Sequence, residues 1–190
     1  MKNKTEIQGL VEIFKKAGVL KEVKRTGWIL KGVEEVESVA DHTWRMELFV
    51  LLLTPPSLDR SKLLEMCVVH DLGETGVGDI KWETGKKIIS SPKIKHKDEM
   101  QTMRDIFNGY EKADKYISLL QEFNEQKTPE AQFLKQIDKL EMALQALEYQ
   151  QKGYPSVQFD EFWENAEKYL QRKSLEPIFR YLQELRKKSS

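Results

Sequence analysis

The sequence predicts an all-α fold. Apolar residues recur at helical spacing in most segments of the chain, and glycine or proline stands where several of these runs end. No two runs alternate apolar and polar residues in the way that indicates a pair of strands. The chain has 190 residues, which is enough for one sizeable core, and nothing in it has the composition of a linker. We therefore expect a single domain over 1–190.

The first helix is expected to begin near Thr5, because Thr5 followed by Gln8 has the form of a capping box. Apolar residues then recur at helical spacing until Gly18, where the helix should end. Residues 19–37 contain two glycines and several β-branched residues without a sustained period. This segment is expected to be an extended connector or loop.

Ser38, with Asp41 three residues later, is expected to cap a second helix that the Pro55-Pro56 pair must stop. Ser57 or Asp59 would cap the next helix, which is apolar on much of its surface and therefore central. That helix should reach His70 and break at the glycines that follow, Gly73, Gly76 and Gly78. Residues 81–93 are expected to form a loop. Helical patterns then return at about 94–109, 112–124, 129–151, 159–172 and 174–187.

The composition excludes several classes of function. The 31 basic and 31 acidic side chains cancel, so no net field attracts nucleic acid or an anionic membrane, and we expect neither as a partner. The longest apolar runs are too short to span a bilayer, and the first residues lack the apolar block of a secretory signal, so a cytoplasmic protein is expected. Cys67 is the only cysteine, which excludes an internal disulfide and favours a small buried hydrophobe at that position.

Two of the three histidines, His42 and His70, fall within apolar helices, whereas His96 lies among charges and is expected on the surface. Each histidine alone could be a hydrogen-bonded core residue. Together with Asp71 they suit a divalent transition metal, because imidazole supplies nitrogen and aspartate supplies a charged oxygen. Adjacent side chains diverge by roughly 100° on a regular helix, but a helix that ends at His70 would let both residues face one ion.

Asp138 is the candidate for a fourth ligand. It adjoins the apolar face of the long helix expected over 129–151, and a buried carboxylate is costly unless it is paired or bound to a metal. The alternative is an ion pair with Lys135 or Lys139 at the helix surface.

These residues carry a family resemblance. A histidine, then a His-Asp pair, then a distant aspartate on an all-α chain resembles the HD-domain metal-dependent phosphohydrolases. The surrounding segments RTGWILKGVEEVESVADHTWRM, VVHDLGETGVGDI and EAQFLKQIDKLEMALQALEY are similar to the 5′-deoxynucleotidase branch of that family. The resemblance runs over about 19–150 and implies an HD-domain helical bundle with that core and with the C-terminal helices, 159–187, packed on it.

The resemblance implies a divalent ion, cobalt or manganese with magnesium as a further choice, held by His42, His70, Asp71 and Asp138. It implies that Glu74 is the catalytic glutamate and that Asp79 contacts the sugar of a nucleotide. It also implies a possible second ion on Glu74, Asp79 and Ile80. From the residues alone, Glu74 could equally be a carboxylate at a helix end.

Trp28 lies fourteen positions before His42, as in the family, which implies that it borders the deoxyribose; it could equally be a core tryptophan. The bacterial members place an arginine immediately before that tryptophan to orient phosphate, whereas here Gly27 stands there. Arg25, or a lysine from 81–87, would then neutralise the phosphate. The KWETGKK segment also departs from the loop of many relatives, so contacts there do not transfer.

The resulting hypothesis is a metal-dependent enzyme that hydrolyses deoxyribonucleoside 5′-monophosphates to deoxynucleoside and phosphate. Two alternatives stay open at this stage. One is an HD-type hydrolase of another nucleotide, such as a triphosphate, a cyclic nucleotide or an alarmone. The other is a non-catalytic helical binding protein that a metal stabilises. The resemblance also implies a homodimer, for which the amphipathic C-terminal helices are one possible surface.

Overall fold

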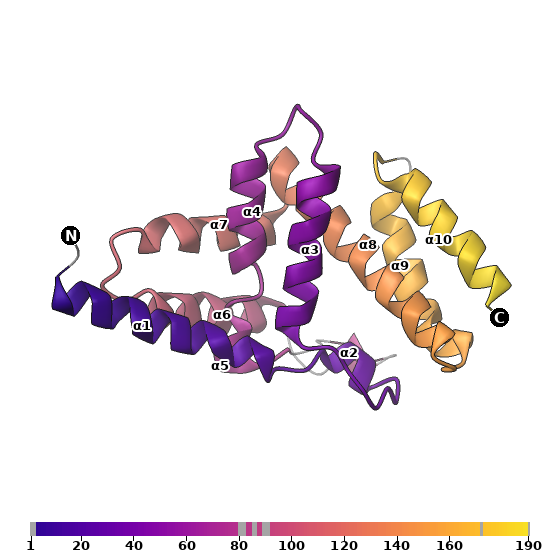
Figure 1. Ribbon diagram of the computed structural model, residues 1–190, viewed down its shortest axis with the longest axis horizontal. Coiled ribbons are helices and arrows are strands. Elements are labelled where there is room, and N and C mark those ends of the chain that lie inside the picture. Colours follow the sequence, from indigo (N-terminus) through magenta and orange to yellow (C-terminus); the bar gives the residue numbers. More distant parts are fainter. Residues whose placement is uncertain (1–2, 80–82, 85–86, 89–91, 172, 190) are drawn as a thin grey trace.

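The computed structural model describes residues 3–79, 83–84, 87–88, 92–171 and 173–189. Its architecture confirms the all-α prediction. Figure 1 shows α3 and α4 standing across the layer formed by α1, α5 and α6, with α8, α9 and α10 stacked on the other side. The α-helices are α1 (Lys4–Gly18), α2 (Thr26–Ile29), α3 (Val39–Leu53), α4 (Arg60–Val69), α5 (Glu74–Val77), α6 (Pro92–Ile106), α7 (Ala113–Glu125), α8 (Pro129–Gln151), α9 (Asp160–Leu170) and α10 (Glu176–Lys188).

The helix caps agree with the sequence at two positions and differ at one. Ser38 caps α3 in a capping box with Asp41, as predicted, and Asp59 rather than Ser57 caps α4. The predicted cap of α1 is wrong, because the box is formed by Asn3 and Glu6, two residues earlier than the predicted pair. Asparagine caps a helix as well as serine does, and the Glu6 carboxylate reaches back to the main-chain N–H of Asn3 at 2.8 Å.

The expected connector over 19–37 is more structured than predicted. It contains the 3-10 turn η1 (Val19–Lys21) and the short helix α2, and an isolated bridge joins Lys24 to Ser38. The buried indole of Trp28 anchors α2 to the core, and such a tertiary contact is invisible to periodicity. The segment after Gly78 also differs from a plain loop, because two short antiparallel strands, β1 (Glu83–Thr84) and β2 (Lys87–Ile88), pair there.

The glycines after His70 do not only end a helix. Gly73 and Gly76 also allow α5 to pack closely on α6. A Cβ on Gly73 would lie 2.7 Å from Cβ of Glu99, and one on Gly76 would lie 2.5 Å from the hydroxyl of Thr102. Gly78 then turns the chain at a φ of +75°, in the region that favours glycine. The close approach places Glu74 beside α6.

The centre of the molecule is α8, which packs against α3, α4, α7, α9 and α10. Its predicted bounds, 129–151, are confirmed, and Pro129 stands in its first turn, where a missing N–H costs nothing. The 3-10 turn η2 (Ser156–Phe159) leads into α9, and α9 and α10 contribute Trp163 and Phe179 to the buried cluster. Within the described ranges, no helix combines the length and the apolar character that crossing a membrane requires.

Candidate metal centre

Three helices bring the four predicted ligands together. His42 lies on α3, His70 is the C-terminal cap of α4 with Asp71 directly after it, and Asp138 lies in the middle of α8. Nε2 of His42 is 3.7 Å from Oδ1 of Asp138 and 3.9 Å from Oδ2 of Asp71, and Nε2 of His70 is 3.1 Å from that same Asp71 oxygen. Four side chains from three separate parts of the sequence therefore face one small volume.

The two imidazoles are oriented toward this volume from behind. Nδ1 of His70 lies 2.7 Å from the main-chain oxygen of Cys67, and Nδ1 of His42 lies 2.5 Å from Oε2 of Glu141. With Nδ1 as the donor in both contacts, each Nε2 carries a lone pair. Both Nε2 atoms are buried, and neither makes a hydrogen bond within the described chain. Two buried imidazole nitrogens that face two carboxylates fit a divalent transition ion.

The carboxylates are held in their charged form. Burial alone would raise the pKa of Asp71, but the neighbouring histidines and Arg25 hold it well below its usual range. Burial likewise opposes ionisation of Asp138, and the two lysines, Lys135 at 2.7 Å and Lys139 at 3.3 Å, keep its pKa well below its usual range. The ion pair of Asp138 with Lys135 and Lys139 is confirmed, but its expected place at the helix surface is wrong, because Asp138 is buried. The lysines contact Oδ2, and Oδ1 faces His42.

Glu74 lies at the edge of this group, on α5. Its side chain is almost fully buried, Oε1 accepts from Nζ of Lys95 at 2.9 Å, and Oε2 has no hydrogen-bond partner among the described residues. Burial and the charges of Asp71 and Asp79 raise the pKa of Glu74 well above its usual range, although Lys95 opposes them. A carboxyl group with a raised pKa beside a metal centre is a candidate for proton transfer.

Arg25 and Asp79 close another side of the centre. Nη1 of Arg25 is 3.3 Å from Asp71, and its Nε is 3.9 Å from Oδ2 of Asp79. The same Asp79 oxygen accepts from the main-chain N–H of Thr26 at 2.7 Å, and the Thr26 hydroxyl donates to the Asp79 carbonyl. The start of α2 is therefore tied to the turn after Gly78, with the guanidinium beside the carboxylates.

Trp28 fills the core, which is one of the two roles that the sequence left open. Its indole is 1% exposed, Nε1 donates to Glu37 at 2.9 Å, and the ring packs against the aromatic rings of Tyr149, Phe159 and Phe162. These contacts support the core role, and the sugar-bordering role stays a prediction.

Of the remaining candidate residues, His96 and Cys67 lie among the described residues, and Ile80 does not. His96 is exposed on α6, as expected, and Cys67 is fully buried, where burial raises the pKa of its thiol. Ile80 and the lysine side chains of 81–87 lie outside the described residues, so the second-ion prediction for Ile80 stays a prediction.

Sequence reasoning missed three residues of the centre, Arg45, Lys95 and Glu141. Arg45 and Glu141 each stand one helical turn after a predicted ligand: Arg45 follows His42 by three positions, and Glu141 follows Asp138 by three. A signal existed for Glu141, because a glutamate three residues after Asp138 shares its helix face and is therefore directed to the same side.

Comparisons with known proteins agree with this geometry. A family model described as an HD domain matches residues 17–178, and the chain therefore belongs to the HD-domain family. The protein 5′-deoxynucleotidase hdd1 of Schizosaccharomyces pombe is 39% identical over 139 residues, which cover 70% of this chain and 68% of that protein. The protein 5′-deoxynucleotidase HDDC2 of Xenopus laevis is 37% identical over 145 residues, covering 76% of this chain and 71% of that protein.

Among solved structures, the PH0347 protein from Pyrococcus horikoshii has a TM-score of 0.74 and 31% sequence identity. The match covers 92% of this chain and 99% of that one. Most of this fold thus has a counterpart in a crystal structure.

Proposed function

We propose that this chain is a 5′-deoxynucleotidase, which hydrolyses deoxyribonucleoside 5′-monophosphates to deoxynucleoside and inorganic phosphate. The observation that carries the proposal is the pair of buried Nε2 atoms that make no hydrogen bond among the described residues and face Asp71 and Asp138, with an arginine and a glutamate at the edge. Relatives that bear the name 5′-deoxynucleotidase support the choice of substrate, since they are up to 39% identical to this chain.

The residues would divide the reaction between them. His42, His70, Asp71 and Asp138 would hold a divalent ion, which would lower the pKa of a water molecule from about 15.7 toward about 7 and so supply a nucleophile at neutral pH. Arg25 is the cation best placed to neutralise charge on a phosphate at the centre, because its guanidinium already faces Asp71.

Glu74 would hold and transfer the proton that the leaving 5′ oxygen requires, since its surroundings favour the protonated form. Asp79 would accept a hydrogen bond from the 3′-hydroxyl of the sugar. We propose cobalt or manganese as the ion, with magnesium as the weaker candidate, because two nitrogen ligands suit a transition metal better than magnesium.

The test is phosphate release from a panel of deoxy- and ribonucleoside monophosphates with cobalt, manganese and magnesium, run beside His70→Ala. We expect metal-dependent release from the deoxy compounds and none from His70→Ala. Release from a triphosphate, a cyclic nucleotide or an alarmone instead would favour another HD-type hydrolase. No release with any metal, in a chain that unfolds on chelation, would favour the non-catalytic alternative.

Asp79→Asn tests the sugar contact separately. The substitution keeps the shape of the side chain and removes the negative charge that strengthens its hydrogen bond from a hydroxyl group. We expect KM for deoxynucleotides to rise while the bound metal is retained. Unchanged turnover together with unchanged metal content would show that Asp79 only ties α2 to its turn.

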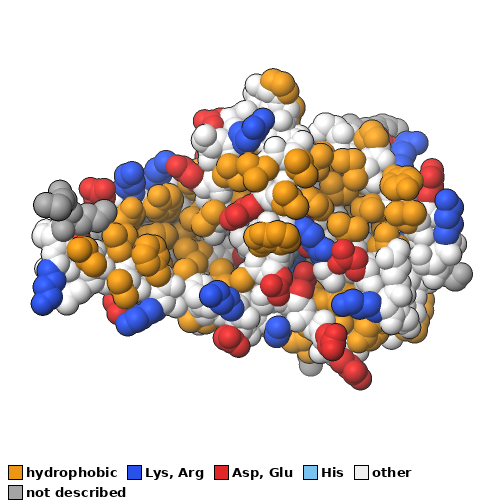
Figure 2. Space-filling view, in the orientation of Figure 1, with side chains coloured by type: hydrophobic (Ala, Val, Ile, Leu, Met, Phe, Trp, Pro, Cys, Tyr) orange, Lys and Arg blue, Asp and Glu red, His pale blue; other side chains and the backbone are white. Residues whose placement is uncertain are grey.

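We also propose a homodimer, and the exposed apolar side chains favour a surface other than the C-terminal helices. A groove of about 680 Å³ runs between α1, α3 and α4, and Figure 2 shows hydrophobic side chains gathered over these helices. Phe14 and Trp44, both 66% exposed, stand at this groove with the half-exposed Val68. Burying such side chains against a second copy removes apolar area from water.

Light scattering during gel filtration tests this surface. Trp44→Glu is expected to give a monomer, whereas the matched substitution Tyr181→Glu, at an exposed aromatic residue of α10, is expected to leave a dimer. The reverse result would place the interface on the C-terminal helices. A cytoplasmic location stays a prediction from the sequence, and fractionation of cells that express the chain tests it.

A further inference from the structure

His42 and His70 differ in what holds the imidazole ring. Nδ1 of His70 faces a main-chain oxygen of its own helix at 2.7 Å, so the fold of α4 alone fixes that contact. Nδ1 of His42 instead faces the carboxylate of Glu141, on a different helix, at 2.5 Å. Both His42 and Glu141 are 0% exposed. The orientation of His42 therefore depends on whatever holds Glu141 in place.

Arg45 holds Glu141. Its Nε and Nη2 atoms donate to Oε1 of Glu141 at 2.8 and 2.6 Å, while the other carboxylate oxygen, Oε2, faces His42. A guanidinium fork on a carboxylate fixes orientation as well as charge. Arg45 lies one turn from His42 on α3, and Glu141 lies one turn from Asp138 on α8, so the pair also sets the spacing of two helices that carry predicted ligands.

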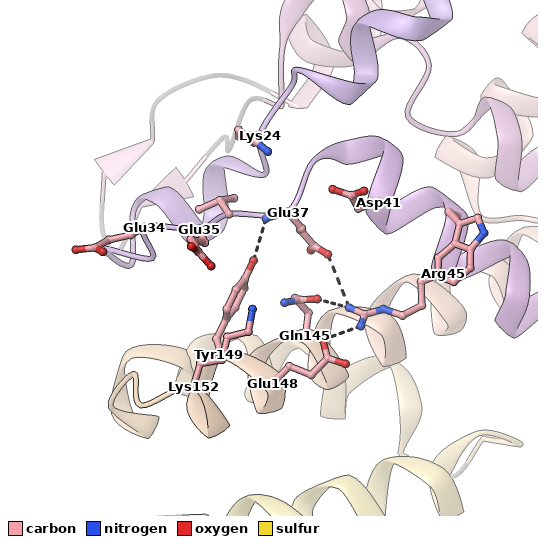
Figure 3. A pocket seen from close by; sticks show the side chains of 12 residues that line it. Lys24, Glu34, Glu35, Glu37, Asp41, Arg45, Gln145, Glu148, Tyr149 and Lys152 are labelled. Atoms are coloured by element: carbon pink, nitrogen blue, oxygen red, sulfur yellow. Dashed lines mark hydrogen bonds and ion pairs between the residues drawn. The ribbon is translucent and has the colours of Figure 1, made fainter.

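The outer side of Arg45 faces a polar cavity of about 630 Å³, shown in Figure 3. There its Nη1 donates to Glu148 at 2.7 Å, its Nη2 donates to Gln145, and Glu37 lies 3.7 Å away. These contacts hold the guanidinium on its solvent-facing side. The Glu141 carboxylate behind it is fully buried from solvent.

We infer that Glu141 and Arg45 are positioning residues for His42: the Arg45 fork fixes the Glu141 carboxylate, which fixes the ring of His42 so that Nε2 faces Asp71 and Asp138. A hydrogen bond to the far nitrogen of a ligand imidazole fixes its tautomer and strengthens its donation to the metal, which is worth about 10–100-fold in metal affinity. The inference rests on the metal centre of the proposed function and is independent of the substrate.

Glu141→Gln tests the pair, because it keeps the shape of the side chain and removes its charge. The Kd for cobalt is measured by calorimetry on the full chain after chelation and dialysis, and the visible absorption of the cobalt-loaded protein is recorded beside it. We expect Kd to rise about 10–100-fold and the absorption bands to shift. Glu130→Gln is the matched control, because it removes the same charge from the same helix at a contact with Lys62. We expect no change in either readout there.

A purely structural role makes a different prediction. In that case Glu141→Gln would lower the unfolding temperature of the metal-free chain and leave the cobalt Kd and spectrum as in the wild type, which overturns the inference. If Glu141→Gln does not fold, Arg45→Lys decides, because lysine keeps the charge but lacks the fork. A raised Kd supports the pair, and a wild-type Kd overturns it. If the wild-type chain binds cobalt but releases no phosphate from deoxynucleotides, the proposed substrate is wrong and the inference about Glu141 and Arg45 is unaffected.

Discussion

Glu74 is the residue whose surroundings differ most from those of an ordinary surface glutamate. Its carboxyl group is buried between the negative charges of Asp71 and Asp79, and Lys95 is the cation that contacts it. Burial costs a charged group more than a neutral one, so this position favours a protonated side chain near a centre where a leaving group needs a proton.

Glu74→Gln is therefore expected to lower kcat by about 10² to 10⁴ while the chain keeps its metal, since an amide cannot transfer the proton. Phosphate release and metal analysis of the same sample measure both quantities. Glu99→Gln is the control, because Glu99 also contacts Lys95, at 3.3 Å, from the neighbouring helix. Loss of metal together with activity in Glu74→Gln would instead assign Glu74 to a second ion.

The indole of Trp28 gives a test between two roles. Trp28→Phe would remove the hydrogen bond to Glu37 and leave that partly buried carboxylate with one partner fewer, at a cost of about 1–3 kcal/mol in the free energy of unfolding. If the core role is correct, the ratio of kcat/KM for deoxy- and ribonucleotides stays constant. Urea unfolding and the two kinetic constants check the prediction, and a changed ratio would restore the sugar-bordering role.

At the scale of elements, the position of Glu74 depends on how closely α5 approaches α6. Gly73 and Gly76 permit this approach, because a Cβ at either position would overlap atoms of Glu99 or Thr102. In the sequence, these glycines indicate only the end of a helix. Their role in close packing is visible only in the tertiary structure, where α6 lies beside them.

Gly73→Ala is expected to lower the free energy of unfolding by about 1–3 kcal/mol, because the added methyl group must displace the main chain of α6 near Glu99. Gly9→Ala is the matched control: it lies inside α1 with no atom within 4 Å of the added Cβ, and we expect a gain of about 0.5–1 kcal/mol. Urea unfolding compares the two, and equal effects would contradict the packing argument.

At the scale of the whole molecule, α8 joins the centre to the C-terminal helices, because it carries Asp138 on one face and packs on α9 and α10 with others. We expect one domain over 1–190. A single unfolding transition, coincident by circular dichroism and by tryptophan fluorescence, is the expected result. Two separate unfolding transitions would show that the chain contains two domains.

Removal of the metal is expected to lower the unfolding temperature without unfolding the chain at 25 °C. A bound ion stabilises by about 2.7 kcal/mol at a free concentration of 100 times its Kd. Without it, the ion pairs of Asp71 with Arg25 and of Asp138 with Lys135 still compensate the buried carboxylates. Calorimetry with and without a chelator measures the difference, and unfolding on chelation at 25 °C would contradict this account.

The sequence by itself determined the all-α class, the bounds of α8, the capping box of α3 and the residue types of the metal centre. These features are local: a helix cap lies within three residues, and a helical period is visible in a dozen. The resemblance to the HD-domain family, on His42, His70, Asp71 and Asp138, is confirmed at the level of the family.

Only the tertiary structure decided what surrounds those residues. Whether Trp28 fills the core, whether Lys135 and Lys139 contact Asp138, and whether Glu141 faces His42 all depend on which helices pack together, and a periodic pattern does not specify partners. The physical reason is that burial, pKa and hydrogen bonding are set by neighbours distant in the chain: the contact between His42 and Glu141 spans 99 positions.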